Sequence, residues 1–283
     1  MRRAVALWLA APPVAVALPA AVARVVAVAL LAAAALPVVL AAAAAMAAEP
    51  AAPQTDDAIA AALLGAQYGS ARRDGCYVQR TADLGSFCMK AIHHQRVDVP
   101  GGARLYVLAD GWPMNAKGEV EDIGTHASPG LVGAFELALG GSGTGPSRHL
   151  IAASKALRFG SFGRSNADGA RFTRIGPGDD FAWIFVSGGT WQGISVGSHV
   201  ILAAHGGRFV NVSDIPAITE QEQGERLDIA VDASSGDRPL YPLIVTRQPV
   251  NDRGQPVGAP DRTWTVHFNN RLWKYPWPPG QNR

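Results

Sequence analysis

The side chains of this sequence that could do chemistry are a pair of adjacent acids, scattered histidines and clustered aromatic rings. Asp179 and Asp180 form the acid pair, directly after Gly178. Paired carboxylates can hold calcium or catalyse glycoside hydrolysis. Neighbouring residues of an extended chain point to opposite sides, however, and no calcium-binding loop surrounds this pair. The pattern therefore favours carboxylates that stabilise a turn.

The seven histidines do not form a metal-binding motif. His93 and His94, followed by Asp98, are the densest group, but adjacent strand residues diverge, so that only one of the two rings would reach a shared ion. The sequence also lacks the H-E-x-x-H and Cys/His spacings of zinc sites, a nucleophile elbow and a phosphate loop. We therefore predict no metal site and no cofactor. A catalytic triad built from distant residues stays open.

Two tryptophans in predicted loops are candidate ligand-binding residues. Trp112 lies in a Gly-Trp-Pro sequence, and Trp191 stands between Gly189 and Gly193. A tryptophan at such a position either closes one end of the core or faces a ligand from a rigid scaffold. Both interpretations stay open for both residues.

Residues 271–283 form a predicted C-terminal tail that is rich in proline and expected to run extended along the surface. Its rings belong to Trp273, Tyr275 and Trp277, and the interleaved prolines exclude a helix or a central strand. The tail either fills a groove of the domain with its rings or offers an aromatic platform to a sugar or a proline-rich partner. These three residues complete the predicted ligand-binding set.

One short segment resembles a catalytic element of secreted ADP-ribosyltransferases. Glu220, Gln221 and Glu222 match the E-x-E element of those enzymes. The resemblance implies that Glu222 orients the nicotinamide ribose and that Arg104 takes the place of an arginine on an early strand. It covers three residues, and the segment 187–190 departs from the Ser-Thr-Ser strand of that family.

The elements that must position these side chains are predicted to be short antiparallel strands. Residues 181–186 are apolar on both alternating faces, which indicates a strand covered on both sides. Residues 194–204 form a second apolar run after a glycine-containing segment, so the two runs predict a central hairpin. Further short runs between turn residues, without strand–helix alternation, predict a mainly β fold, either an antiparallel β-sandwich or a barrel-like single domain.

Changes in composition along the chain set the predicted boundaries of the domain and the linker. Residues 72–270 form the β-rich domain, and residues 49–71 form a linker with one short N-terminal helix. Thr55 is the expected N-cap of that helix, because two acids follow it and suit a first helical turn.

Residues 1–48 predict export, because a positively charged start, a long apolar stretch and small residues at the end are typical of a signal peptide. Cleavage is expected after Ala47 or Ala48. The segment is longer than the usual 15–30 residues or so. A later start of translation near Val22, or a retained membrane anchor, are the alternatives. We predict an extracytoplasmic location, periplasmic or secreted, with membrane contact only through an uncleaved leader.

The charge balance of the chain narrows the expected partners. The chain carries 25 basic and 23 acidic residues, and three arginines but no acid lie in the leader, which leaves 22 basic against 23 acidic groups. A nearly neutral domain argues against nucleic acid as a partner.

Cys76 and Cys88 are the only cysteines, and such a pair in an exported protein predicts one disulfide.

Together these features predict an exported β-rich binding or interaction module whose ligand is a carbohydrate or a protein surface. A secreted hydrolase with a dispersed active site is one alternative. An ADP-ribosyltransferase-like enzyme that uses Glu220 and Glu222 is another. Whether the protein is an enzyme is left open by the sequence.

Overall fold

The computed structural model describes residues 54–72, 74–121, 125–140, 148–191, 194–219, 224–236, 239–251 and 255–277. The predicted leader, residues 1–48, and the E-x-E segment with Glu220 and Glu222 lie outside this part of the chain. So does the side chain of Trp191.

The described residues contain one α-helix and two antiparallel sheets. The first sheet has the strand order β1 (Tyr77–Thr81), β2 (Gly85–Val99), β3 (Gly102–Met114), β4 (Gly130–Leu139) and β5 (Arg148–Phe159). The second sheet has the order β13 (Arg262–Val266), β12 (Leu243–Pro249), β11 (Glu225–Val231), β10 (Pro216–Thr219), β8 (Ile194–His205), β7 (Phe181–Trp191) and β6 (Arg171–Arg174), and β9 (Arg208–Asn211) pairs with β8. The helices are α1 (Asp56–Tyr68) and the single 3-10 turn η1 (Ala167–Gly169). The prediction of a mainly β, sandwich or barrel-like fold is confirmed.

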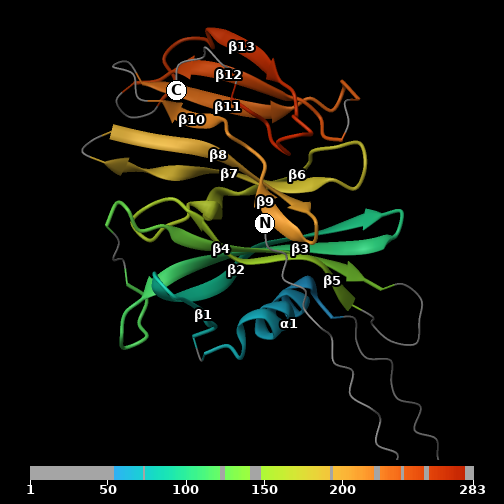
Figure 1. The fold of residues 1–283 in the computed structure, drawn as a ribbon, viewed down its shortest axis with the longest axis vertical. Coiled ribbons are helices and arrows are strands. Elements are labelled where there is room, and N and C mark those ends of the chain that lie inside the picture. Colours follow the sequence, from blue (N-terminus) through green and yellow to red (C-terminus); the bar gives the residue numbers. More distant parts are fainter. Residues whose placement is uncertain are drawn as a thin grey trace, which may run out of the picture. The chain divides into compact units, whose positions relative to one another are not determined.

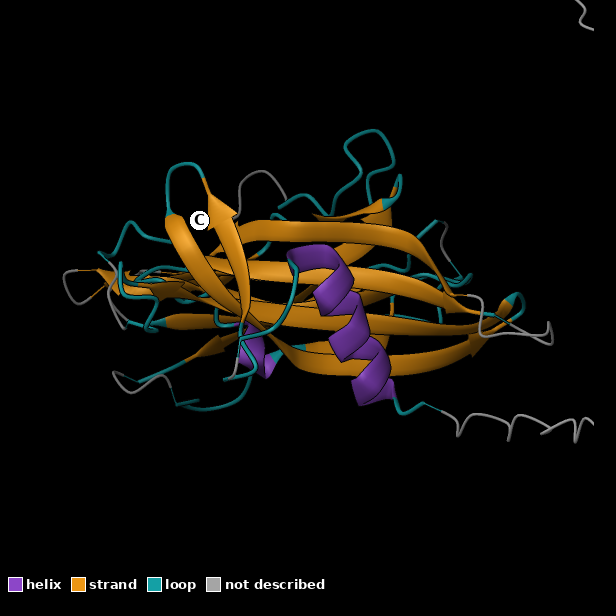
Figure 2. Cartoon of the chain, turned by 90° about the horizontal axis from the view of Figure 1, so that it is seen from below, coloured by secondary structure: helices purple, strands orange, loops and turns teal. Residues whose placement is uncertain are grey.

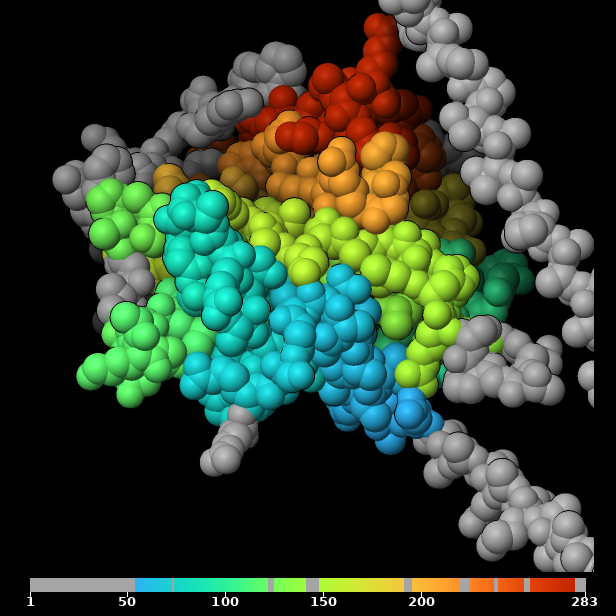
Figure 3. All heavy atoms as spheres, turned by 60° about the horizontal axis from the view of Figure 1, so that its bottom comes forward, coloured from blue at the N-terminus to red at the C-terminus, as the bar shows by residue number. Residues whose placement is uncertain are grey.

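Helix α1 begins where the sequence predicts. The hydroxyl of Thr55 accepts a hydrogen bond from the Ala58 amide at 3.3 Å, which satisfies one of the unpaired amides of the first turn. Asp56 and Asp57 lie in that turn, where a carboxylate interacts favourably with the helix dipole. Figures 2 and 3 show the helix packed on the outer face of the first sheet. Among the described residues, no helix is long and apolar enough to cross a membrane.

Figure 1 shows the helix and the sheets stacked in layers, and three apolar cores hold these layers together. The first core lies between α1 and the first sheet and is built from Ile59, Leu63, Leu64, Phe87, Met89, Leu105, Val107, Leu131 and Phe135. The second core lies between the two sheets and is built from Tyr106, Leu108, Val132, Ala134, Phe181, Trp183, Phe185, Val200, Leu202 and Phe209. The third core lies within the curled second sheet and is built from Ile175, Ile184, Ile201, Val212, Ile215, Leu227, Leu243, Val245, Val266, Tyr275 and Trp277.

The predicted central hairpin is confirmed as β7 and β8, which separate the second core from the third. Phe181 and Trp183 point into the second core, whereas Ile184 points into the third. This alternation explains why the sequence is apolar at every position of the strand. Gly188 lies opposite Gly197, and a Cβ at Gly188 would come within 2.0 Å of a backbone oxygen of β8. The strands can therefore approach this closely only where side chains are absent.

The predicted disulfide is confirmed. Cys76, just before β1, is joined to Cys88 of β2, and both are fully buried. Trp112 lies directly opposite Cys88 in β3, so its predicted position in a loop is wrong. β3 does not turn at its Gly-Trp-Pro sequence, because its pairing with β2 continues to Met114.

Loss of the disulfide is expected to lower stability. The covalent bond closes a loop with a sequence separation of 12 residues, and the chain-entropy model assigns a bond of this span roughly 3 kcal/mol. A Cys76→Ser, Cys88→Ser double variant should therefore unfold at a lower urea concentration than the wild type. The wild type under reducing conditions should behave like the variant. Equal midpoints for oxidised and reduced wild type would contradict a structural role.

The tail is part of the fold between residues 271 and 277. The Tyr275 amide donates to the Val212 carbonyl at 2.7 Å, and its hydroxyl donates to the Tyr241 carbonyl at 2.6 Å. Tyr275 is 0% exposed and Trp277 is 8% exposed. The rings of Tyr275 and Trp277 therefore fill a groove of the domain, as one of the two interpretations predicts. These two residues do not lie extended on the surface.

Candidate ligand-binding site

A cluster of charged side chains lies at one end of the space between the two sheets. Arg104 and Tyr106 of β3 are two residues apart, so both point toward the second sheet. Glu136 of β4 reaches the same place from the neighbouring strand, since Tyr106 pairs with Glu136 in the strand register. These polar groups end the second core, which is otherwise apolar.

Glu136 is a buried carboxylate held by an arginine and a tyrosine. Arg104 Nη1 donates to Glu136 Oε1 at 2.8 Å, and the Tyr106 hydroxyl donates to the same oxygen at 2.9 Å. The residue is only 2% exposed. Among the described residues, the buried side-chain nitrogens and oxygens without a hydrogen-bond partner are Nε1 of Trp183, Trp264 and Trp273. A buried donor without an acceptor is costly, because it loses its hydration and gains nothing in return.

The second sheet contributes two further acids from the turn between β6 and β7. Arg104 Nη2 approaches Asp179 Oδ2 at 3.5 Å, so this guanidinium links the two sheets. The turn is fixed by the Ile175 amide, which donates to the Asp180 carbonyl at 2.8 Å. Gly176 completes it, because a Cβ there would lie 2.6 Å from Asp180 Oδ2.

Asp180 holds its proton more tightly than an ordinary aspartate. Burial raises the pKa of this carboxyl, and the negative charge of Asp179 raises it further, against a hydrogen bond from the Gly178 amide. In contrast to Asp179, Asp180 forms no ion pair within the described part of the chain. Burial and Asp179 therefore disfavour its charged form, and the positive charges of Arg104 and Arg174 only partly oppose this effect.

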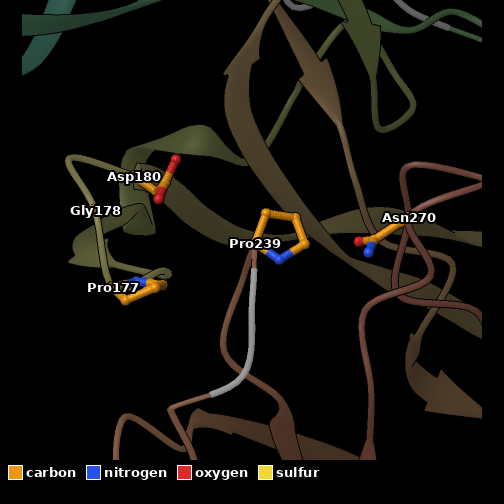
Figure 4. Close-up of a pocket in the computed structure, with 5 residues that line it drawn as sticks. All are labelled: Pro177, Gly178, Asp180, Pro239 and Asn270. Carbon is orange, nitrogen blue, oxygen red and sulfur yellow. The ribbon is translucent and has the colours of Figure 1, made fainter.

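Two adjoining cavities open at this cluster and share Asp180. The smaller has a volume of about 160 Å³ and is lined by Arg104, Tyr106, Glu136, Ile151, Ile175, Asp179, Asp180, Phe181, Ala203, Ala204, Leu240 and Trp273. The larger has a volume of about 410 Å³ and is lined by Pro177, Gly178, Asp180, Pro239 and Asn270 (Figure 4). The larger volume falls within the range of about 300–1,000 Å³ that is typical of small-molecule sites.

Trp273 is the one predicted ligand-binding residue that the structure brings to this site. Its backbone has a φ of 53°, and the turn is held by Asn269, whose side-chain oxygen accepts from the amide of Leu272 at 3.1 Å. The ring stacks on His205 with 4.0 Å between the ring centres. One ring face is therefore occupied, and the remaining edge of the indole borders the cavity.

The other predicted ligand-binding residues lie elsewhere. Tyr275 and Trp277 are buried in the third core, which leaves them no free ring face. Trp112 is eight residues from Arg104 along β3, or about 27 Å at the usual rise per strand residue. The backbone of Trp191 lies at the end of β7 that is remote from Asp180.

The opposite end of the sandwich holds a second polar cluster. The Ser165 hydroxyl donates to Asp110 Oδ1 at 2.5 Å, and the Ser187 hydroxyl donates to the Ser165 carbonyl at 3.0 Å. Burial raises the pKa of Asp110. These groups join β3, the segment before η1 and β7, so they stabilise the contact between the sheets.

A third cavity, of about 270 Å³, lies beside β11 and is bordered by Arg171, His199 and Asp228. Two of these polar groups are engaged with the backbone: His199 Nε2 lies 2.6 Å from the Leu227 carbonyl, and Arg171 donates to the Ile229 carbonyl at 2.8 Å. Burial lowers the pKa of His199. The histidine is therefore neutral and holds two strands together.

The acids of the candidate site are not arranged as a metal centre. Among the described residues, no three His, Cys, Asp or Glu side chains are close enough to one another to hold a metal ion. Comparison with protein-family models, with curated proteins and with solved structures found no match. What the site does must therefore be argued from its own geometry.

Sequence reasoning missed Glu136 and Tyr106. Glu136 is a single acid within the apolar run Gly130–Leu139 of β4. Charged residues are seldom fully buried unless they are paired, so an acid at such a position indicates a partner and often a functional site. That signal was present in the sequence. The partner, 32 positions earlier, was not identifiable from it.

Proposed function

We propose that this protein is an exported binding module for a carbohydrate, and that the ligand occupies the two cavities around Asp180. The observation that carries the proposal is Nε1 of Trp273, a buried donor without an acceptor among the described residues, in a side chain that lines the smaller cavity. A sugar hydroxyl supplies the missing acceptor. The leader and the disulfide support export.

The chemistry of the lining suits a polyhydroxylated ligand. Carboxylates accept hydrogen bonds, the Arg104 guanidinium donates them, and the Asn270 side-chain amide does both. Sugars carry hydroxyl groups that donate and accept at fixed angles, and their C–H groups can contact apolar lining residues such as Ile151 and Leu240. A few polar groups at fixed positions beside apolar walls are what small-molecule sites use for orientation.

The expected result for Glu136→Gln is a loss of sugar binding. The substitution keeps the shape of the side chain but offers a donor where the ligand needs an acceptor. The full chain, recovered from the extracytoplasmic fraction, would be titrated with glucose, galactose, mannose and their disaccharides in a calorimeter. We expect an affinity at least tenfold weaker for the variant, which corresponds to about 1.4 kcal/mol.

Glu119→Gln is the matched control, because Glu119 is exposed and remote from the cavities. It should bind like the wild type. Binding by wild type with unchanged affinity in Glu136→Gln would remove the cavity from the proposal. A wild type that binds no sugar in the titration, and shows no thermal stabilisation by any of them, would contradict carbohydrate binding and favour a protein partner.

A secreted hydrolase is the second candidate, favoured by two carboxyls in different environments at one cavity. The raised pKa of Asp180, caused by burial, suits a proton donor, whereas Glu136 is ion-paired. Glycosidases use two such carboxyls, one as acid and one as base or nucleophile. Release of reducing ends from an oligosaccharide by wild type, lost in Asp180→Asn, would establish this alternative.

A further inference from the structure

We propose that the site selects sugars that carry an acetamido group, and that this group enters the smaller cavity while the sugar ring occupies the larger one. This inference rests on the proposed function and names the substituent that distinguishes the ligand. It is carried by three features of the smaller cavity, which are its size, its apolar wall and the unpaired Nε1 of Trp273.

The two cavities differ in size and share one residue. The larger, of about 410 Å³, falls within the range of about 300–1,000 Å³ that small-molecule sites occupy, whereas the smaller, of about 160 Å³, falls below it. The larger cavity therefore has room for a sugar ring, and the smaller has room for one substituent of that ring. Asp180 lines both cavities, so it lies where the substituent joins the ring.

Trp273 holds a hydrogen-bond donor at the smaller cavity in a fixed position. Its Nε1 is buried and has no acceptor among the described residues. The ring stacks on His205 with 4.0 Å between ring centres, and it meets Phe268 edge to face at 5.1 Å. The φ of 53° is unfavourable for a bulky residue, and such strained residues cluster at ligand-binding sites. An acceptor on the ligand would remove the cost of the unpaired donor.

Apolar side chains form much of the wall of the smaller cavity. They are Ile151, Ile175, Phe181, Ala203, Ala204 and Leu240. A group that fills this cavity must therefore combine an acceptor for Trp273 with apolar surface. An acetamido group does both, because its carbonyl oxygen accepts and its methyl group covers apolar wall. Its N–H lies next to the sugar ring, where the Asp180 carboxyl offers an acceptor.

Other common substituents of sugars satisfy only part of this lining. A hydroxyl group can accept from Trp273 but leaves the apolar wall uncovered. An ammonium group has donors and no acceptor, so it leaves the indole N–H unpaired. A carboxylate accepts, but it would face Glu136, Asp179 and Asp180, and Arg104 is the one basic residue among the described residues that line the cavity.

The test compares N-acetyl sugars with their counterparts on the full chain. N-acetylglucosamine, N-acetylgalactosamine and N-acetylmannosamine would be titrated in a calorimeter at pH 7, each beside its parent hexose and its free amine. We expect at least one N-acetyl sugar to bind about tenfold more tightly than both of its counterparts, which corresponds to about 1.4 kcal/mol. Trp273→Phe, which removes the N–H and keeps an aromatic ring, should reduce this preference to less than threefold.

Trp264→Phe is the matched control. Trp264 also has a buried Nε1 without an acceptor among the described residues, but it lies on β13 and is not among the residues that line either cavity. This variant should keep the preference. A preference that Trp273→Phe retains, or that both variants lose equally, would overturn the proposal.

The wild type alone gives a second measurement if Trp273→Phe does not fold. The indole N–H signals in its nuclear magnetic resonance spectrum report on the same contact. Addition of the N-acetyl sugar should shift one of these signals downfield by more than the parent hexose does, because the carbonyl accepts from Trp273. Equal shifts with both sugars would overturn the proposal.

The results separate this inference from the proposed function. Equal binding of N-acetyl sugars and their parent hexoses would overturn the selectivity for the acetamido group and leave carbohydrate binding in place. If neither class of sugar binds, both proposals are wrong.

Discussion

Replacement of Arg104 by methionine should destabilise the protein by about 3–5 kcal/mol at pH 7, because it leaves the buried carboxylate of Glu136 without its positive partner. Methionine keeps much of the aliphatic volume of arginine, so the effect reports the charge rather than a cavity. Urea unfolding followed by tryptophan fluorescence measures it.

Arg158→Met is the matched control for this experiment. Arg158 also forms an ion pair, with Asp83 at 2.6 Å, but both side chains are about half exposed. Ion pairs of this kind contribute little to stability. Its unfolding midpoint should be close to that of the wild type. An equal effect of the two substitutions would contradict a buried charge at Glu136.

Truncation of Tyr275 to alanine is expected to cost about 3–5 kcal/mol, the usual range for a large aromatic residue removed from a core. The ring is 0% exposed and contacts Phe268 with 5.0 Å between ring centres. Tyr275→Phe should cost less, about 1–3 kcal/mol, because it only leaves the Tyr241 carbonyl without its donor. Both values follow from urea unfolding at neutral pH.

Leu272→Ala tests whether the effect belongs to the tail as such or to its buried rings. Leu272 lies in the same segment but is 60% exposed. Its replacement should leave the unfolding midpoint nearly unchanged. A tail that lies on the surface would give small effects at both positions. That outcome would contradict the burial of Tyr275 in the third core.

The fold was predictable where the signal is local. The alternation in residues 181–186 specifies a strand with two covered faces, and the structure places β7 between two cores. The N-cap at Thr55 is equally local. Trp112 shows the limit of this approach. Its flanking glycine and proline favour a turn, yet β3 continues through them because β2 offers a partner strand. Tertiary pairing overrides local preference.

The candidate site was predictable only in fragments. Asp179 and Asp180 were identified as a pair, with a role in a turn, and Trp273 as a ligand-binding residue. Nothing in the spacing of these residues indicated that Arg104, 75 positions before Asp179, would join them. Such a contact arises from the stacking of two sheets whose relative position is not encoded in any short segment. Glu136 gave the clearest single signal, as an acid within an apolar strand.

The placement of Tyr275 and Trp277 sets an order of events during biosynthesis. The third core cannot be completed before residue 277 has been synthesised, because these two rings fill its interior. Until then the nascent chain exposes apolar surface on β8, β11 and β12.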